Sequence, residues 1–294
     1  MIGRGIVILK TWIEALRVTH WIKSGFCLAA LFFHGDALHV EKWLQLLPVV
    51  VSFSLAASAG YLLNDLLNAE EDARHPRKRK RPVTSGRISR GAAARVMVLL
   101  AVAAVLLVAG YYGWGPVLWV LVGYLLVTGL YSLVFREVPF VDVVVLGLGF
   151  VARVAGGAFA LALVPTVWLL ACTYTLSLLL GFGKRKGEWR CLETHHQKVG
   201  ETRKALRGYP RGMLDGAIGL SAVLAGGAYL MYCLQRPDRM PFLLTAVPVV
   251  MGLMSYLRFA WRSEQVETPE RLFLHSPVLL VSVAVWGGMV VFLV

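Results

Sequence analysis

Long apolar stretches dominate the chain, and short polar segments separate them. A helix of about twenty apolar residues spans the hydrocarbon core of a bilayer, whereas a half-buried strand alternates apolar and polar positions. Nine stretches fit the helical pattern, at residues 18–38, 43–66, 93–111, 115–135, 139–163, 165–183, 213–233, 241–260 and 275–294. The pattern predicts an all-α integral membrane protein, a bundle of about nine transmembrane helices in one domain over residues 1–294.

Composition agrees with a membrane protein. The chain is 57% hydrophobic and 16% charged, against about 25% charged residues in typical soluble domains. Glycines recur at close spacing inside the apolar stretches, as at Gly147, Gly149, Gly156 and Gly157, and small residues let membrane helices approach closely. The four cysteines lie far apart without zinc-ligand spacing, so neither a zinc site nor a disulfide framework is indicated.

The positive charges fall mainly on one side of the predicted spans. Of the 30 Lys and Arg residues, 26 lie on that side, three lie on the other, and Arg153 lies within a span. The positive-inside rule therefore places the N-terminus and two long connecting segments, about 64–91 and 183–211, in the cytoplasm. We expect a multi-pass protein of the inner (cytoplasmic) membrane, with a central polar cavity that opens to the cytoplasm. The net charge of +13 needs no nucleic-acid partner to explain it.

Acids and amides follow the second apolar stretch directly, in the run from Asn64 to Asp72. If this run is helical, Asn64, Asp65, Asn68 and Asp72 share one face, because successive residues turn by 100°. Clustered oxygen ligands of this kind suit Mg²⁺, which binds one or two carboxylates together with substrate phosphates. A helix end that simply enters water is the alternative, although acids beside a membrane span are costly. We predict Asp65, Asn68 and Asp72 as metal ligands, with Asp65 and Asp72 catalytic.

A dense basic segment follows, with six Lys or Arg residues from Arg74 to Arg81. Alone it would read as a topology anchor or a patch for anionic lipids. Beside the acids it favours a phosphate clamp, in which arginine binds phosphate oxygens bidentately and lysine acts as a point charge. The candidate substrate ligands of this region are Asn64, His75, Lys78, Arg79 and Arg81.

The two motifs together resemble the first signature of the UbiA-type intramembrane prenyltransferase superfamily. That signature is Asn-Asp-x-x-Asp-x-x-x-Asp followed by basic residues and Arg-Pro, and this chain reads NDLLNAEED and then ARHPRKRKRP over residues 64–82. The middle aspartate of the family is Asn68 here, which keeps an oxygen ligand but lacks the charge. The resemblance implies a Mg²⁺-dependent transferase that handles a diphosphate.

Within the superfamily, the chain is most similar to the polyprenyl-phosphate (decaprenyl-phosphate) phosphoribosyltransferase branch. The matching segments are Arg17…Trp21-Ile22-Lys23, Tyr131-Ser132-Leu133, Val138-Pro139…Asp142, Gly149-Phe150…Arg153, Phe182-Gly183-Lys184-Arg185…Glu188 and Thr268-Pro269-Glu270. The departures are Val18, Ser24 and Ser276. The resemblance implies substrate contacts from Lys23, Tyr131, Asp142, Arg153, Lys184 and Arg185, and a catalytic role for Glu188.

The segment from Lys184 to Glu188 distinguishes the phosphoribosyltransferase branch from the aromatic prenyltransferases. Aromatic prenyltransferases of the superfamily carry a second aspartate-rich signature there, whereas this chain has Lys-Arg-Lys-Gly-Glu, whose charge suits a donor with more phosphates. Positive-inside anchoring is the alternative.

Asp142 and Arg153 are eleven residues apart, so on a helix they share a face about 16 Å apart along the axis. An intramembrane arginine is either functional or held by an ion pair or by backbone carbonyls.

We expect transfer of a 5-phosphoribosyl group from phosphoribosyl diphosphate (PRPP) to polyprenyl phosphate, giving polyprenylphosphoryl-5-phosphoribose and diphosphate. The acceptor oxygen is already anionic, which agrees with the absence of an evident histidine–carboxylate dyad in the sequence. Two alternatives stay open: prenyl transfer from a polyprenyl diphosphate to an aromatic or other acceptor, and a non-enzymatic lipid-phosphate transporter. An oligomer is compatible with either enzyme.

Overall fold

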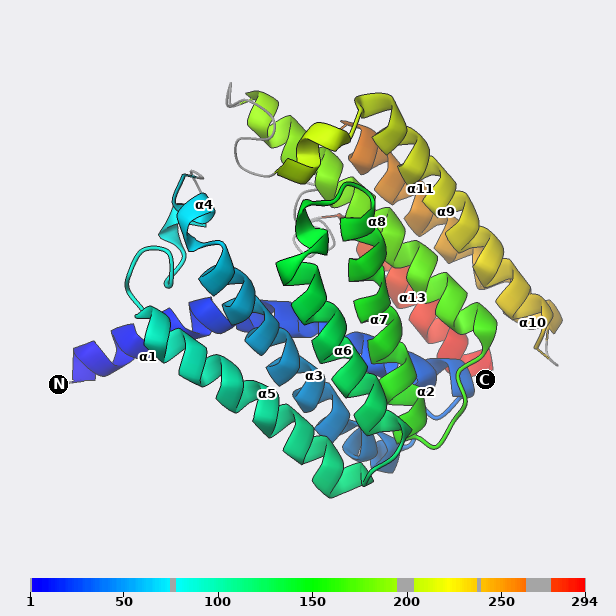
Figure 1. The fold of residues 1–294 in the computed structure, drawn as a ribbon. Helices are drawn as coiled ribbons and strands as arrows, with labels where there is room; N and C mark the ends of the chain where they lie inside the picture. The colour runs from blue at the N-terminus through cyan, green and yellow to red at the C-terminus, as the bar shows by residue number, and fades with distance from the viewer. Residues whose placement is uncertain (1, 75–77, 195–203, 237–238, 263–275, 294) are drawn as a thin grey trace.

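The computed structural model describes residues 2–74, 78–194, 204–236, 239–262 and 276–293, and every regular element in them is a helix (Figure 1). The order of the elements is α1 Ile2–Leu16, the 3-10 helix η1 Val18–Leu28, α2 Ala29–His34, α3 Val40–Leu67, α4 Ala69–Arg74, η2 Lys78–Lys80, α5 Arg90–Tyr112, α6 Pro116–Leu133, η3 Phe135–Glu137, α7 Val141–Ala160, α8 Val167–Thr194, η4 Lys204–Gly208, α9 Arg211–Leu234, α10 Arg239–Leu243, α11 Ala246–Arg262 and α13 Pro277–Leu293.

Seven helices in these residues are long and apolar enough to cross a membrane. They are Val40–Leu67, Arg90–Tyr112, Pro116–Leu133, Val141–Ala160, Val167–Cys191, Gly212–Leu234 and Met240–Arg262. Each coincides with a predicted stretch, and the predicted last span corresponds to the shorter apolar helix Pro277–Leu293. The multi-pass helical bundle is therefore confirmed, whereas the expected count of nine spans is not.

The first predicted span, 18–38, is not one continuous helix. It folds as η1 followed by the short α2, which ends at His34 and is capped by Gly35 with φ 93°. The polar residues His20, Lys23 and Ser24 interrupt the apolar pattern in η1, and the tighter 3-10 path lets this segment lie against α3 and α7. The prediction that this stretch is helical was correct, but the prediction that it forms one continuous span was wrong.

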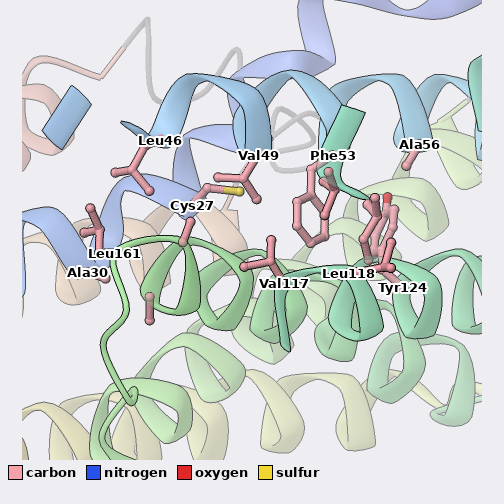
Figure 2. Close-up of a cluster of buried hydrophobic side chains, with 14 of the residues drawn as sticks. Cys27, Ala30, Leu46, Val49, Phe53, Ala56, Val117, Leu118, Tyr124 and Leu161 are labelled. Carbon is pink, nitrogen blue, oxygen red and sulfur yellow. The ribbon is translucent and has the colours of Figure 1, made fainter. Parts of the chain in front are cut away.

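A hydrophobic core joins η1 to α3, α6 and α7 (Figure 2). Phe53 of α3 is fully buried and meets Tyr124 of α6 at a ring-centroid distance of 5.2 Å. Glycines in α7 permit the close approach: a Cβ at Gly157 would lie 1.8 Å from the carbonyl oxygen of Cys27, and one at Gly156 would lie 2.6 Å from the Phe53 ring. The expectation that small residues bring the helices together is confirmed here.

A second core holds α8, α9, α11 and α13 together around Leu179, Ile218 and Tyr256. Helix α8 continues without a break through Lys184 and Glu188 to Thr194. The start of the predicted second loop is therefore helical, in agreement with the high helix propensity of Lys, Arg and Glu. Figure 1 shows the α3–α4 corner, the α6–α7 connection and the end of α8 at the same end of the bundle.

Candidate functional site

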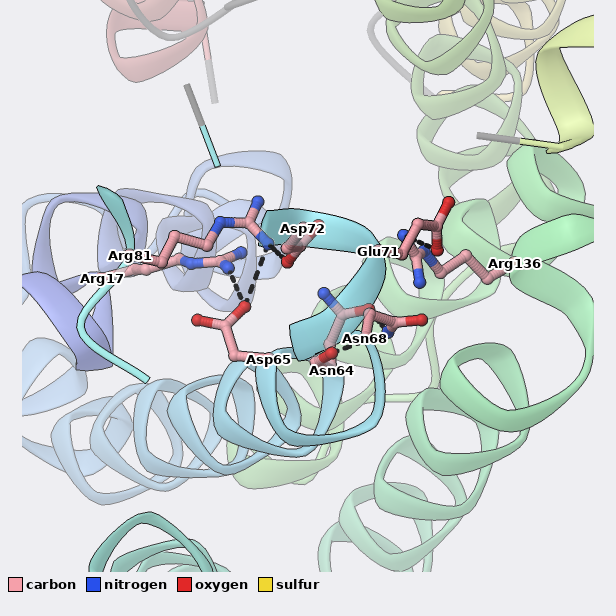
Figure 3. A network of polar contacts seen from close by, with 8 residues as sticks. All are labelled: Arg17, Asn64, Asp65, Asn68, Glu71, Asp72, Arg81 and Arg136. Carbon is pink, nitrogen blue, oxygen red and sulfur yellow. Dashed lines mark hydrogen bonds and ion pairs between the residues drawn. The ribbon is translucent and has the colours of Figure 1, made fainter. Parts of the chain in front are cut away.

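The acidic motif lies at a corner where α3 ends and α4 begins. Helix α3 ends at Leu67, Asn68 leaves helical geometry at φ −111° and ψ 17°, and α4 starts at Ala69. Asp65 in the last turn of α3 and Asp72 in α4 are each 1% exposed. The corner therefore brings two buried carboxylates from consecutive helices toward each other, as Figure 3 shows.

Two arginines face these carboxylates. Arg17 Nη2 lies 2.6 Å from Asp65 Oδ1, while Arg81 Nη1 lies 3.1 Å from the same oxygen and 2.5 Å from Asp72 Oδ2 (Figure 3). We call Arg17, Asp65, Asp72 and Arg81 the acid–arginine cluster. Its acids have side chains 1–2% exposed, whereas the arginine side chains are 19% and 25% exposed. The cations therefore form the accessible side of the cluster.

Arg17 was not among the predicted site residues. It links α1 to η1 with a left-handed backbone, φ 50° and ψ 50°, and its guanidinium lies 4.6 Å from the centre of the Tyr61 ring. Burial lowers the pKa of Arg17, and the neighbouring Asp65 carboxylate opposes that shift. Only the resemblance of the Arg17–Lys23 segment could have drawn attention to it, because its partner lies 48 residues away.

The two amides of the motif contact each other rather than the acids. Asn68 Nδ2 donates to the Asn64 carbonyl oxygen at 2.6 Å and to Asn64 Oδ1 at 3.0 Å. Beside them, Glu71 forms a 3.1 Å ion pair with Arg136 of η3, an arginine that is 5% exposed and that the sequence did not single out. This pair ties the corner to the α6–α7 connection, while the metal role of Asn68 and the substrate role of Asn64 stay predictions.

A second ionic cluster lies around Asp142, which is 0% exposed at the start of α7. Arg185 Nε lies 2.8 Å from Asp142 Oδ2, and Arg185 Nη1 lies 2.5 Å from Glu188 Oε2. Tyr209 donates its hydroxyl proton to Asp142 Oδ1 and accepts the Phe140 N–H at 2.6 Å. We call Asp142, Arg185, Glu188 and Tyr209 the sealed cluster. Burial raises the pKa of Tyr209, with Asp142 adding to the shift, so the tyrosine stays a donor.

Arg153 is buried inside the bundle. Its Nη1 donates to the Gly149 carbonyl oxygen at 2.7 Å and its Nη2 to the Tyr124 hydroxyl at 2.9 Å. The guanidinium also lies 4.7 Å and 5.6 Å from the ring centres of Tyr124 and Phe150. This geometry matches the carbonyl-bonding alternative for an intramembrane arginine, and its contact with substrate stays a prediction.

The remaining predicted ligands are distributed around this end of the bundle. Lys78 and Arg79 lie in η2 after the described part of α4, and Arg79 is exposed. Lys23 in η1, Tyr131 near the end of α6 and Lys184 in α8 are half-buried. His75 lies outside the described residues.

The acid–arginine cluster has the donor set that Mg²⁺ uses. Asp65 and Asp72 direct one oxygen each at the same nitrogen of Arg81, so both can reach one ion with substrate phosphates as the other ligands. The described residues contain no group of three or more His, Cys, Asp or Glu side chains arranged to hold a metal. A Mg²⁺ site in which substrate phosphates supply the remaining ligands fits these residues better than a site made of protein ligands alone.

The fold and this end of the bundle define a multi-pass helical membrane protein with buried acids beside accessible arginines. The chain belongs to the UbiA prenyltransferase family, whose profile matches residues 25–277.

Named relatives and solved structures agree with this membership. The chain is 29% identical to a decaprenyl-phosphate phosphoribosyltransferase of Mycolicibacterium smegmatis, over 94% of this chain and 90% of the relative. It is also 29% identical to the protein of that name in Mycobacterium tuberculosis, over 83% and 81%. A UbiA homolog from Archaeoglobus fulgidus, solved bound to GPP and Mg²⁺, matches with a TM-score of 0.72 over 96% of this chain and 99% of that one, at 14% identity.

Proposed function

We propose that this protein transfers a 5-phosphoribosyl group from PRPP to a polyprenyl phosphate, releasing diphosphate, on the cytoplasmic side of the inner membrane. The observation that carries the proposal is the acid–arginine cluster, in which two buried carboxylates and two accessible guanidinium groups meet at the end of α3. The relatives named decaprenyl-phosphate phosphoribosyltransferase support this choice of donor and acceptor.

Asp65 and Asp72 are the residues that would hold Mg²⁺ with the donor. Their carboxylates are almost fully buried, and in the structure they pair with Arg17 and Arg81. Binding of magnesium with the donor would replace these arginine contacts at the carboxylates. The ion would supply charge neutralisation on the diphosphate oxygens as the leaving group departs.

The guanidinium group of Arg81 would then bind phosphate oxygens of the donor. Its side chain is 25% exposed, and a guanidinium binds a phosphate with two parallel hydrogen bonds. Arg79 is exposed on the same segment, and Lys78 lies beside it. These cations stabilise the negative charge that develops on the diphosphate in the transition state. We expect this electrostatic stabilisation to be the largest contribution to the rate enhancement.

The bond changes require no strong base. The bond between the ribose anomeric carbon and the diphosphate oxygen breaks with its electron pair leaving on diphosphate, and an anionic oxygen of the lipid phosphate forms the new bond to carbon. Glu188 is occupied by Arg185, which agrees with a reaction that needs no carboxylate to remove a proton. The apolar helices around the cluster leave the polyprenyl tail of the acceptor in the bilayer.

The test uses the full chain reconstituted in proteoliposomes with Mg²⁺, labelled PRPP and a polyprenyl phosphate. We expect label in the lipid-extractable fraction, and its loss when Mg²⁺ is removed with EDTA. The opposing assay supplies a labelled polyprenyl diphosphate with an aromatic acceptor. Activity in that assay alone would replace the proposal with prenyl transfer, and activity in neither would favour a lipid-phosphate transporter.

A further inference from the structure

The N-terminal half of α1 carries an apolar stripe that no other part of the described chain covers. Ile6, Leu9 and Ile13 are 61%, 62% and 45% exposed, and their spacing of three and four residues places them on one face of the helix. Lys10 and Glu14 are exposed on the neighbouring side, which also carries Val7, and Ile8 is exposed outside the stripe. A stripe of large apolar side chains beside charges needs a partner with both an apolar and a polar layer.

The position of α1 identifies that partner. Ala15, near its C-terminal end, belongs to a buried cluster with Leu62 and Ala93, which lie near the end of α3 and the start of α5. Figure 1 shows α1 running across these two helices, with its N-terminal half projecting beyond the bundle. The stripe therefore lies beside the ends of two membrane-spanning helices, at the end of the bundle that carries the acid–arginine cluster.

We propose that α1 lies in the membrane interface as an in-plane anchor, with Ile6, Leu9 and Ile13 among the acyl chains and Lys10 directed to the lipid phosphates. A helix with an apolar face and a polar, basic face binds this boundary by apolar burial and by attraction to anionic lipids. The half-buried Trp12 lies on the same helix, at the depth where tryptophan is enriched in membrane proteins.

This anchor is connected directly to the candidate site. Helix α1 ends at Leu16, and the next residue is Arg17, whose left-handed backbone directs its guanidinium to Asp65. Glu14 is also held by Arg87, with two hydrogen bonds of 2.8 and 2.9 Å. The depth of α1 in the lipid therefore sets the position of Arg17, which makes turnover sensitive to the membrane surface.

A fluorescent reporter tests whether the apolar stripe of α1 contacts the acyl chains. An environment-sensitive dye is placed on Leu9→Cys in a chain whose four native cysteines are replaced, and Val7→Cys is the matched control, because Val7 is 65% exposed outside the stripe. In proteoliposomes of phosphatidylglycerol and phosphatidylcholine, we expect a blue-shifted emission at residue 9 that acyl-chain quenchers reduce, and neither effect at residue 7.

Equal quenching at both positions, or none at residue 9, would overturn the anchor. A shift at residue 9 that disappears when the protein is diluted into excess lipid would also overturn it, because that result assigns the stripe to a second copy of the chain. The readout uses no substrate, so it stands apart from the proposed reaction.

The rate of turnover tests whether the depth of α1 in lipid controls the position of Arg17. This part of the inference rests on the proposed function. We expect Leu9→Asn to lower the rate of lipid labelling by about tenfold, since small misplacements of positioning groups cost up to about a hundredfold. Val7→Asn makes the same chemical change off the stripe and should stay within about twofold of the parent. An unchanged rate for Leu9→Asn, with residue 9 inserted in lipid, would remove the coupling and leave the anchor. Absence of turnover in the parent chain would instead count against the proposed function.

Discussion

The acid–arginine cluster and the sealed cluster use the same chemical groups in different surroundings. In the first, Arg17 and Arg81 have side chains 19% and 25% exposed around acids that are buried. In the second, the Arg185 side chain is 2% exposed between Asp142 and Glu188. The first keeps its cations where a ligand can reach them, whereas the second encloses its cation between two acids.

We expect this difference in exposure to distinguish groups that bind substrate from groups that stabilise the fold. A partly exposed guanidinium such as that of Arg81 can exchange a carboxylate for a phosphate with less rearrangement than a fully buried one. A guanidinium inside the bundle must keep its partners, since breaking one buried pair leaves an uncompensated charge. We therefore expect substitutions in the sealed cluster to change stability and substitutions in the acid–arginine cluster to change turnover.

The largest expected effect is on stability, for Asp142→Asn. The amide keeps an acceptor for Tyr209 but removes a charge from Arg185, and breaking a buried pair costs about 3 kcal/mol. We expect a clear fall in the melting temperature of the protein in detergent. Asp215→Asn is the matched control, because Asp215 of α9 pairs with Lys186, the residue after Arg185 in α8, but the Asp215 side chain is 45% exposed. Equal shifts for the two variants would show that burial does not separate these ion pairs.

Asp72→Asn should act on turnover instead. It removes one of two converging carboxylates, and loss of one group that stabilises transition-state charge costs about a hundredfold in rate, or about 2.7 kcal/mol. The rate of lipid labelling measures it, with the melting temperature close to that of the parent. Glu70→Gln, an exposed acid on the same helix, should keep full activity. A variant that loses stability but keeps its rate would place Asp72 with the structural acids.

Tyr209→Phe should have a smaller effect. Burial raises the pKa of Tyr209, so the hydroxyl is protonated at neutral pH, and the substitution removes its donor to Asp142. A lost hydrogen bond to a charged group costs about 1.5–3 kcal/mol. Tyr111→Phe, at an exposed tyrosine, is the control in the same melting experiment. No difference between the two variants would show that the Asp142 contact adds nothing to stability.

The smallest effect is expected for Glu14→Gln. Glu14 raises the pKa of Arg87 through hydrogen bonds, but both side chains are about half exposed, and such surface pairs contribute about 0.2–1 kcal/mol. The difference in melting temperature from the parent should disappear in high salt, because salt screens exposed charges. A large effect that persists in salt would place this pair with the buried ones.

Hydropathy alone predicted most of the fold. The stretch predicted at 43–66 is helix α3 from Val40 to Leu67, and that at 93–111 is α5 from Arg90 to Tyr112. Such spans are predictable because a helix in lipid must satisfy its own backbone and expose apolar side chains. The prediction of one span at 18–38 was wrong because the apolar residues outweigh His20, Lys23 and Ser24 in the hydropathy of the stretch, and because the path of η1 also depends on its contacts with α3 and α7.

The candidate site was predictable only where its parts are close in sequence. Asp65, Asp72 and Arg81 lie in one motif, and the structure brings them together. Arg17 joins them from another element through a left-handed turn that local propensity does not indicate. The partners of Arg185 are likewise divided between α7 and α8, so the sequence did not indicate its pairing with Asp142, and its predicted contact with substrate stays a prediction.

The contact between Gly157 and Cys27 has a consequence for biosynthesis. Chains emerge N-terminus first, so η1 is made long before α7, yet its backbone rests where a Cβ on Gly157 would clash with it. The contact between this segment and α7 can therefore form only after the fourth of the seven long apolar helices has been made. One of the earliest parts of the chain to leave the ribosome completes its packing with a helix that is synthesised much later.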